Sequence, residues 1–443
     1  MYIPPSPHTP LLIHGTPCPP RASPVTDWNQ VDKCGAGLCG ATPMVDLWEQ
    51  DRGKPGTAPG PGGGYLSQPA RTLNNSQSCT QANQHAGCRF EDDELLNRAK
   101  FVVTAHAALG NTAPLFLFWA THACHGPREV PQATLDEFAF IDCKARRTYH
   151  ALANYLDGMV GEMVTTLQDK GMWQNTLLVF SADNGGDDQA NNYPQRGAKF
   201  SNWQGGVHVA AFVSGGALPT ARRGIKLAGL ATIWDMLPTL GVLGGLTDSA
   251  ARTDALAEAA GLPAVDGVSQ WGYWSGAVAQ PPRTEVAIGG ELGNENGAPS
   301  GVRFTGPTAS DTGVEALVSS EPGAAIGDPP TLFKYMLGTF HFDHCTGPVF
   351  PSPNSTGFSA NNSEWNVVRN CSVGCLFDLD ADPAERTNVA ADRVAVAAKL
   401  HARLLQINAT AFTPDRGPPD MQRGCVVALG RYGGFWGPFL DLD

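Results

Sequence analysis

The sequence is poor in charge and has no long apolar run. Only 16% of its 443 residues are charged, where globular proteins average about a quarter, and 42 acidic residues against 30 basic ones give a net charge of −12. The chain therefore lacks the cationic surface that nucleic-acid binding requires, although a local basic pocket for a small anion is compatible with it. No stretch approaches eighteen apolar residues, so no membrane span is predicted. A globular, loop-rich protein fits the 42% apolar residues, 51 Gly and 35 Pro.

Several familiar motifs are absent as well. The sequence contains neither a Gly-rich P-loop nor a Gly-x-Ser-x-Gly elbow. Residues 1–23 hold seven prolines and no basic segment followed by an apolar run, so no signal peptide is predicted. Eleven cysteines suit an oxidising compartment, but their odd number leaves at least one outside an intramolecular pair. Two interpretations stay open: a cytosolic protein with many thiols, or a secreted one whose true start is missing.

The apolar pattern predicts three regions. Residues 1–94 show little periodicity and contain a flexible insertion, with nine Gly or Pro among the twelve positions 53–64. Residues 95–330 carry an α/β pattern that weakens beyond 249, and residues 331–443 form a small α+β subdomain. Outside the central segment the expected elements are helices at 95–109, around Pro238 and at 394–407, and strands at 207–213, 332–342 and 376–379.

The central segment predicts a parallel βαβ unit. A continuous apolar run at 115–120 is typical of a strand buried on both faces, and 177–180 is a second such run. Between them, apolar residues at 149–167 recur three and four positions apart, as in an amphipathic helix that ends at Lys170-Gly171. Ligand sites of open α/β sheets lie beyond the carboxyl ends of the strands, so the loops 121–131 and 183–199 are expected at one rim.

Four polar residues of these loops are candidate site residues. Asp183 and Asn184 enter a Gly-Gly turn and present oxygen ligands that suit Ca²⁺ or Mg²⁺, although Asp-Asn-Gly is also common turn chemistry. His125 could exchange a proton or bind an anion, or it could be an ordinary loop histidine. Lys199 could neutralise an oxyanion, or it could be a solvated lysine.

Glycosylation is a further possibility. Five Asn-x-Ser/Thr sequons are present, where chance alone supplies about three, so they support secretion only weakly. They begin at Asn74, Asn354, Asn361, Asn370 and Asn408.

Several ordered segments resemble the sulfatases, most closely the group of arylsulfatases B, I and J. The match is dense over 111–245 and patchy from 330 to the end. Its residues are Leu117-Phe118 with His125-Gly126-Pro127 and Val130-Pro131; Gly171-Met172-Trp173-Gln174-Asn175-Thr176 with Phe180-Ser181-Ala182-Asp183-Asn184-Gly185-Gly186; Asn191-Asn192-Tyr193-Pro194 with Lys199 and Trp203-Gln204-Gly205-Gly206-Val207; Asp235 to Leu240; Leu376 to Leu379; Asp382 to Asn388; and Trp436-Gly437-Pro438.

The resemblance implies an alkaline-phosphatase-like α/β fold, with a large mixed sheet between helices, and hydrolysis of an aryl sulfate or a sulfated carbohydrate. Asp183 and Asn184 would then be ligands of Ca²⁺ in preference to Mg²⁺. His125 and Lys199 would hold the sulfate oxygens, with His125 as acid for the departing alcohol. It also implies a lysosomal or extracellular location, and a disulfide from Cys425 to a cysteine in a part that this chain lacks.

The departures from the family pattern are as informative. The family's nucleophile is a formylglycine made from the cysteine of Cys-x-Pro-x-Arg, preceded by two adjacent Asp, and neither motif can be placed here; Cys18-Pro19-Pro20-Arg21 lacks one residue of the spacing. Gln204 replaces the usual Glu, and His208 the usual Arg. We therefore expect an arylsulfatase truncated before its nucleophile. The alternative is a catalytically inactive sulfatase-like protein that binds sulfated glycans or a protein partner.

Overall fold

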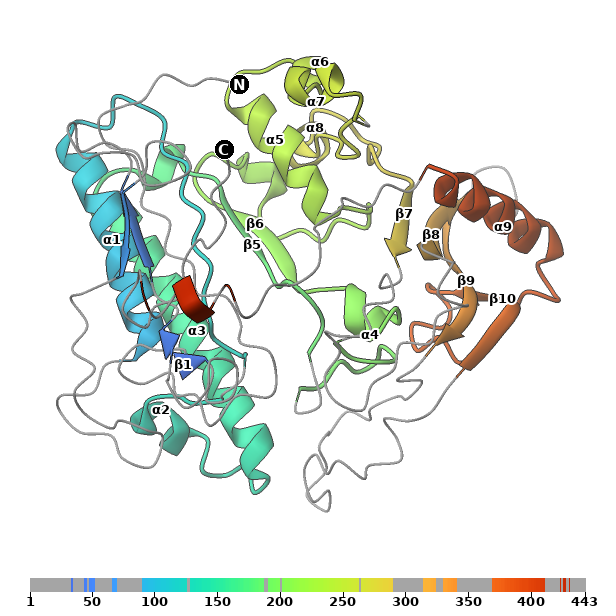
Figure 1. The fold of residues 1–443 in the computed structure, drawn as a ribbon, viewed down its shortest axis with the longest axis horizontal. Helices are drawn as coiled ribbons and strands as arrows, with labels where there is room; N and C mark the ends of the chain where they lie inside the picture. Colours follow the sequence, from blue (N-terminus) through green and yellow to red (C-terminus); the bar gives the residue numbers. More distant parts are fainter. Residues whose placement is uncertain are drawn as a thin grey trace. The chain divides into compact units, whose positions relative to one another are not determined.

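The computed structural model describes residues 90–125, 128–186, 190–199, 201–262, 264–289, 314–323, 330–340 and 369–410, with four short strands before residue 70 and residues 423, 425–427 and 430. The chain forms two compact units, one of residues 175–415 and one of residues 2–174 with 416–443. Figure 1 traces both units along the sequence. Helices and strands occur in both, which confirms the predicted α/β class.

The unit of residues 2–174 is built on two long helices that lie side by side (Figure 1). Helix α1 is Glu91–Ala108, and four acidic residues in its first turn favour the positive end of the helix dipole. Helix α3 is Lys144–Asp169, and Gly171 follows it with φ +65°. Both predicted helices are thereby confirmed. The unit also contains helix α2 (Gln132–Glu137), the antiparallel pair β1 (Lys33–Cys34) and β2 (Met44–Val45), and the antiparallel pair β3 (Trp48–Asp51) and β4 (Leu66–Pro69).

The predicted strand at 115–120 is wrong. These residues are all described, and they run through the structure without forming a strand. Leu115, Leu117 and Trp119 pack against the cluster between α1 and α3, whereas Phe116 and Phe118 are 60% and 58% exposed. An apolar run is buried on both faces only where a layer covers each face, and here the helices cover one.

The unit of residues 175–415 begins with a two-stranded antiparallel ribbon. Strand β5 (Leu178–Ser181) confirms the predicted strand at 177–180, and it pairs with β6 (Ala211–Ser214) in the register Val179 to Val213. The predicted parallel βαβ unit is therefore wrong, because the neighbour of β5 is the next strand along the chain and runs in the opposite direction. Strand β6 starts later than predicted because Gln204–Val207 forms the short helix α4.

One short helix, η1 (Trp173–Asn175), precedes the ribbon. Further short helices follow it along the chain: η2 (Thr220–Arg222), η3 (Ile233–Asp235), α5 (Met236–Leu243), α6 (Asp248–Ala251), α7 (Ala255–Ala259) and α8 (Trp271–Ser275). Helix α5 is the one predicted around Pro238. The carboxylate of Asp235, which is 0% exposed, accepts hydrogen bonds from the backbone N–H of Thr232 and Val268 and pairs with Arg283. Burial opposes its charge, yet these bonds, led by that of Arg283, hold the pKa of Asp235 below its usual value.

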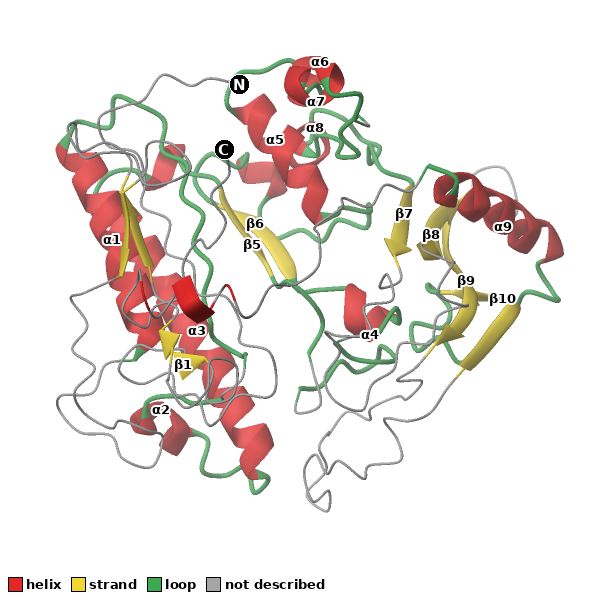
Figure 2. Cartoon of the chain, in the orientation of Figure 1, coloured by secondary structure: helices red, strands yellow, loops and turns green. Residues whose placement is uncertain are grey.

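A four-stranded antiparallel sheet organises the rest of this unit (Figure 2). Its order is β10-β9-β8-β7, with β7 at Glu285–Gly289, β8 at Val314–Glu321, β9 at Thr331–Phe340 and β10 at Arg369–Asp378. Strands β9 and β10 and helix α9 (Val394–Asn408) confirm the predicted elements. Strands β7 and β8 lie where no periodic pattern was found. The predicted domain boundary at 330/331 falls between β8 and β9 of this one sheet, and that three-part division stays a prediction.

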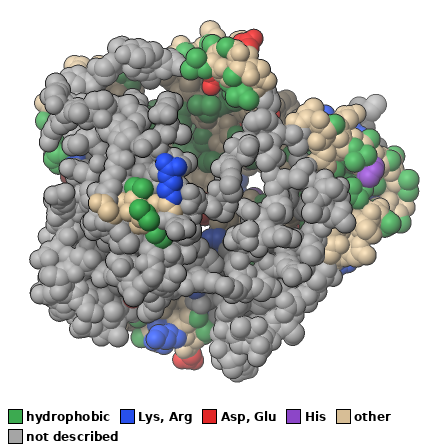
Figure 3. Space-filling view, in the orientation of Figure 1, with side chains coloured by type: hydrophobic (Ala, Val, Ile, Leu, Met, Phe, Trp, Pro, Cys, Tyr) green, Lys and Arg blue, Asp and Glu red, His purple; other side chains and the backbone are tan. Residues whose placement is uncertain are grey.

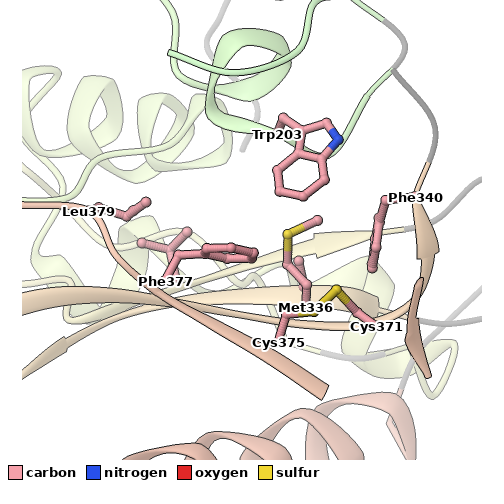
Figure 4. Packing of buried hydrophobic residues seen from close by; sticks show 9 residues of the cluster. Trp203, Met336, Phe340, Cys371, Cys375, Phe377 and Leu379 are labelled. Carbon is pink, nitrogen blue, oxygen red and sulfur yellow. A yellow bond between two sulfur atoms is a disulfide. The ribbon is translucent and has the colours of Figure 1, made fainter. Parts of the chain in front are cut away.

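Both faces of the sheet are covered. On one face, Leu317, Tyr335 and Leu376 pack against Leu400 and Leu404 of α9. On the other, Ala316, Met336 and Phe377 pack with Trp203, which stands just before α4 (Figure 4). Successive side chains of a strand point to opposite faces, so this second face of the sheet holds the residues before α4 in place.

Two further features concern the surface and the cysteines. Apolar side chains are exposed on the surface over α6 and α7 (Figure 3). Leu256 of α7 is 85% exposed. The Sγ atoms of Cys371 and Cys375 lie at disulfide distance, 1.94 Å. Cys425 is disulfide-bonded too, and the pairing expected for it stays a prediction. Within the described residues, no helix combines the length and apolar character needed to cross a bilayer.

Candidate functional site

The first half of the candidate site is the turn that leaves strand β5. Pairing with the β6 segment continues one residue past β5, where Ala182 N donates to Ala210 O at 3.0 Å, and the turn at Asp183 and Asn184 follows. Asn184 N donates to Asp183 Oδ1 at 2.8 Å, and Asn184 Nδ2 donates to Gly185 O at 2.9 Å. These bonds tie both side chains to the neighbouring backbone directly after the strand; an Asx turn would instead join Asp183 Oδ1 to the N–H two residues on.

Backbone hydrogen bonds bring Lys199 to the same turn. Lys199 N donates to Gly186 O at 3.0 Å. The side chain of Asn192 reinforces this contact, because its Oδ1 accepts from Gly186 N at 2.9 Å and its Nδ2 donates to Gly186 O at 2.9 Å and to Gly197 O at 3.2 Å. The structure thus brings three of the four predicted site residues, Asp183, Asn184 and Lys199, into one interlocked turn.

Two glycines permit this close approach. A Cβ atom at Gly185 would lie 1.7 Å from Gly205 O, and Gly185 N donates to Gly206 O at 2.8 Å. Gly197 has φ +76°, and a Cβ there would lie 2.6 Å from Trp203 Cβ. Both positions exclude larger residues, since the backbones of the turn and of α4 are in direct contact.

The donor set fits part of a calcium shell. Asn184 uses its amide nitrogen on Gly185 O, so its Oδ1 is the atom that can coordinate a cation, beside the carboxylate of Asp183. Hard oxygen donors suit Ca²⁺, which takes about six to eight of them. Among the described residues no group of three or more His, Cys, Asp or Glu side chains could hold a metal ion. These two residues therefore supply a minority of the ligands that such an ion needs.

His208 adds a titratable group that our sequence interpretation mentioned only as a departure. It lies directly after α4, and its Nδ1 is hydrogen-bonded to Nε2 of Gln195. Desolvation, and after it the positive charge of Lys334, hold the pKa of His208 below its usual value. A neutral imidazole is thus favoured directly after α4.

His125, the fourth predicted site residue, belongs to the unit of residues 2–174. His125 N donates to His122 O at 3.0 Å, and the two imidazole rings stack with centroids 5.3 Å apart. His122 Nδ1 lies 3.3 Å from Oε2 of Glu91, and His122 N donates to Asp92 Oδ1 at 2.8 Å. Burial raises the pKa of Asp92 to about 6. The predicted meeting of His125 with the turn of Asp183 stays a prediction.

Of the five predicted sequons, two fall on described residues. Asn370 is exposed on β10, where its Oδ1 accepts from Ser372 N at 2.9 Å, and Asn408 is the last residue of α9. Asn74, Asn354 and Asn361 lie outside the described residues. The structure therefore leaves glycosylation as a prediction.

Comparison with known proteins bears on the predicted family. Residues 47–246 match the family model named Sulfatase. Mouse arylsulfatase J is 28% identical over 342 residues, which cover 75% of this chain and 51% of that protein. Mouse N-acetylgalactosamine-6-sulfatase is 28% identical over 117 residues, or 25% of this chain and 21% of that protein. A solved structure, Ps i-CgsB in complex with k-i-k-neocarrahexaose, has a TM-score of 0.49 at 19% identity and covers 78% of this chain and 61% of that one.

The predicted resemblance to the sulfatases is confirmed. The matched region 47–246 contains all four predicted site residues, and the longest of the reported alignments is to an arylsulfatase. The sequence is thus similar to sulfatase-family hydrolases. The chain spans about half the length of arylsulfatase J, and a smaller part of the other relative.

Proposed function

We propose that this chain is part of an arylsulfatase-type hydrolase that cleaves sulfate esters with the help of a calcium ion. The sulfatase family match supports the hydrolase class. The observation that carries the site is the hydrogen bond from Lys199 N to Gly186 O, which holds a cationic residue beside the Asp183–Asn184 turn. Oxygen ligands for a cation and a basic side chain for an anion at one strand end are what sulfate-ester chemistry requires.

Each of the four residues has a role in this proposal. Asp183 and Asn184 would hold Ca²⁺, which screens the negative charge at sulfur when it is bound. Lys199 would hold a sulfate oxygen through its ammonium group. His125 would donate a proton to the departing alcohol oxygen.

The nucleophile belongs to the same proposal. Formylglycine is expected for the family, and this sequence offers no Cys-x-Pro-x-Arg from which to make it. We propose that the nucleophile lies outside the given 443 residues, so that this chain alone does not turn over an aryl sulfate. Measurable hydrolysis of 4-nitrophenyl sulfate by the pure chain would contradict this assignment.

The substrate is proposed to be an aryl sulfate or a sulfated carbohydrate. The name of one relative, N-acetylgalactosamine-6-sulfatase, states action on a sulfated amino sugar, and we extend that substrate class to this chain. The cysteine content supports a lysosomal or secretory location.

One observation favours a second function. The same sequence that keeps Asp183, Asn184 and Lys199 has Gln204 and His208 where the family has Glu and Arg. A sulfatase-like protein without catalysis, which binds sulfated glycans or a protein partner, would have this combination of retained and lost residues.

Calcium binding tests the proposed site. Isothermal titration of the pure chain with CaCl₂ should show binding that Asp183→Ala weakens by at least about tenfold, as expected when a charged ligand is removed. Asp248→Ala is the matched control, because Asp248 is exposed in the first turn of α6 and lies outside the turn. Equal calcium affinity for all three proteins, or no calcium binding by the unaltered chain, would count against the calcium site.

A further inference from the structure

A buried glutamate reaches the candidate site from the far end of the sequence. Glu385 lies in the turn after β10, where Asp382 Oδ2 accepts from Arg386 N and Thr387 N at 2.7 Å each. Its backbone has φ +50°, a conformation that non-glycine residues seldom adopt. The side chain is 0% exposed. The turn therefore delivers a carboxylate into the interior at a cost in backbone conformation.

The loop of Lys199 begins at Arg196 and ends at Gln204, and Glu385 contacts the loop at both of these residues. Its Oε2 accepts from Gln204 N at 2.7 Å, at the start of α4. Its backbone oxygen accepts from Nη1 of Arg196, three residues before Lys199. The two ends are also joined to each other, because Gly205 N donates to Arg196 O at 2.6 Å.

Lys334 completes this arrangement from strand β9. Its Nζ lies 2.8 Å from Oε1 of Glu385, and both side chains are 0% exposed. The same Nζ donates to the backbone oxygen of Asn202, one residue before Trp203. Arg196 and Lys334 also approach the Trp203 ring, at 4.8 Å and 6.0 Å from its centroid. Two cations, one carboxylate and one indole thus enclose the base of the loop.

Packing alone does not require these charges. The same face of the sheet is lined by apolar side chains, Met336 and Phe377 among them, and a buried ion pair can often be replaced by apolar residues without loss of stability. An apolar pair could not accept from Gln204 N or donate to Asn202 O, however. What the charges add is a fixed position for the backbone on both sides of Lys199.

We propose that Glu385, together with Lys334, is a positioning residue for Lys199: the pair holds residues 196–199 and 201–206 so that Lys199 stays on the Asp183–Gly186 turn. This inference rests on the proposed function in one respect only, namely that Lys199 binds the sulfate anion. The fixing of the loop itself does not depend on any activity.

Amide hydrogen–deuterium exchange of the full chain, followed by mass spectrometry, tests the positioning directly. Glu385→Gln keeps the shape of the side chain but removes its charge. We expect exchange in peptides that contain residues 204–208 to accelerate at least tenfold, while peptides from α3 stay unchanged, because loss of the pair opens the loop locally.

The matched control is Glu321→Gln. Glu321 is buried on the same sheet, and its carboxylate contacts Nζ of Lys399, at 2.5 Å, and Oγ of Ser319, at 2.8 Å, so its contacts among the described residues lie away from the loop of Lys199. This variant should leave exchange at residues 204–208 within twofold of the unaltered chain. If both variants accelerate that segment equally at matched global stability, Glu385 serves general stability and the proposal is overturned.

A second variant covers the case in which Glu385→Gln fails to fold. Lys334→Met combined with Glu385→Leu removes both charges at once and should fold, yet it should show the same local acceleration at residues 204–208. Protection equal to that of the unaltered chain would overturn the proposal.

Titration with inorganic sulfate separates this inference from the proposed function. If the unaltered chain binds sulfate, both Glu385→Gln and Lys199→Ala should weaken sulfate binding about tenfold, and Glu321→Gln should leave it unchanged. A sulfate affinity that Glu385→Gln does not change would overturn the link between Glu385 and Lys199. If the unaltered chain binds no sulfate, the proposed function fails at this site, while the exchange experiment still decides the positioning.

Discussion

Removing Lys334 alone should destabilise the protein more than removing Lys334 and Glu385 together. The two charges lie 2.8 Å apart at 0% exposure, so Lys334→Met leaves the carboxylate of Glu385 in a site that water does not reach. Breaking a buried pair in this way costs about 3–5 kcal/mol. In the double variant, Lys334→Met with Glu385→Leu, no charge is stranded, and the remaining cost is that of two unpaired backbone groups, the Gln204 N–H and the Asn202 carbonyl oxygen, at about 1–3 kcal/mol each.

Urea unfolding measures this difference. For a slope of about 3 kcal/mol per M urea, a loss of 4 kcal/mol lowers the unfolding midpoint by about 1.3 M. The double variant should recover part of that shift. Lys100→Met is the control: Lys100 and its partner Glu162 are 33% and 59% exposed, and an exposed pair contributes about 0–1 kcal/mol. A double variant whose loss is the sum of the two single losses would refute the coupling that this argument assumes.

Three further outcomes follow from the packing. Gly185→Ala should lower the melting temperature and abolish calcium binding, because its Cβ would lie 1.7 Å from the backbone oxygen of Gly205 in α4. Gly158→Ala, with open space around it in α3, should instead stabilise the protein by about 0.5–1 kcal/mol. Burial raises the pKa of Asp92 to about 6, so the folded state binds this proton more tightly than the unfolded state does. The free energy of unfolding should therefore fall as the pH rises through 6. Asp92→Asn should flatten the dependence of the melting temperature on pH, measured from pH 4 to 8. Leu404→Ala, at 0% exposure under α9, should cost about 2–5 kcal/mol in urea unfolding, and Leu405→Ala, 50% exposed beside it, much less.

Elements that depend on neighbouring residues were predictable. The three- and four-residue spacing at 149–167 predicted α3, and the apolar runs at 332–342 and 376–379 predicted β9 and β10. The run Asp183-Asn184-Gly185-Gly186 predicted the turn, since its residue types determine the local backbone. Each of these signals lies within one element or one turn.

Elements whose burial or pairing depends on distant parts of the chain were not predictable from the sequence. The run at 115–120 has the apolar composition of a buried strand, but only one of its faces is covered, so Phe116 is exposed. Strand β5 pairs with β6 in an antiparallel ribbon, and the residue types of β5 do not predict its partner or the direction of pairing. Pairing is decided by which strand reaches a free edge, and that depends on the whole fold.

The sequence by itself determined the secondary structure of the long elements, the sulfatase resemblance and the residue types of the candidate site. Only the tertiary structure decided how that site is held. Gln204 and Glu385 are 181 positions apart, and no local pattern relates them. In the sequence, Lys334 is a lysine within the apolar run 332–342. Its role is visible only when the sheet brings its ammonium group beside a carboxylate, because a charge can be buried there only if its partner arrives from another part of the chain.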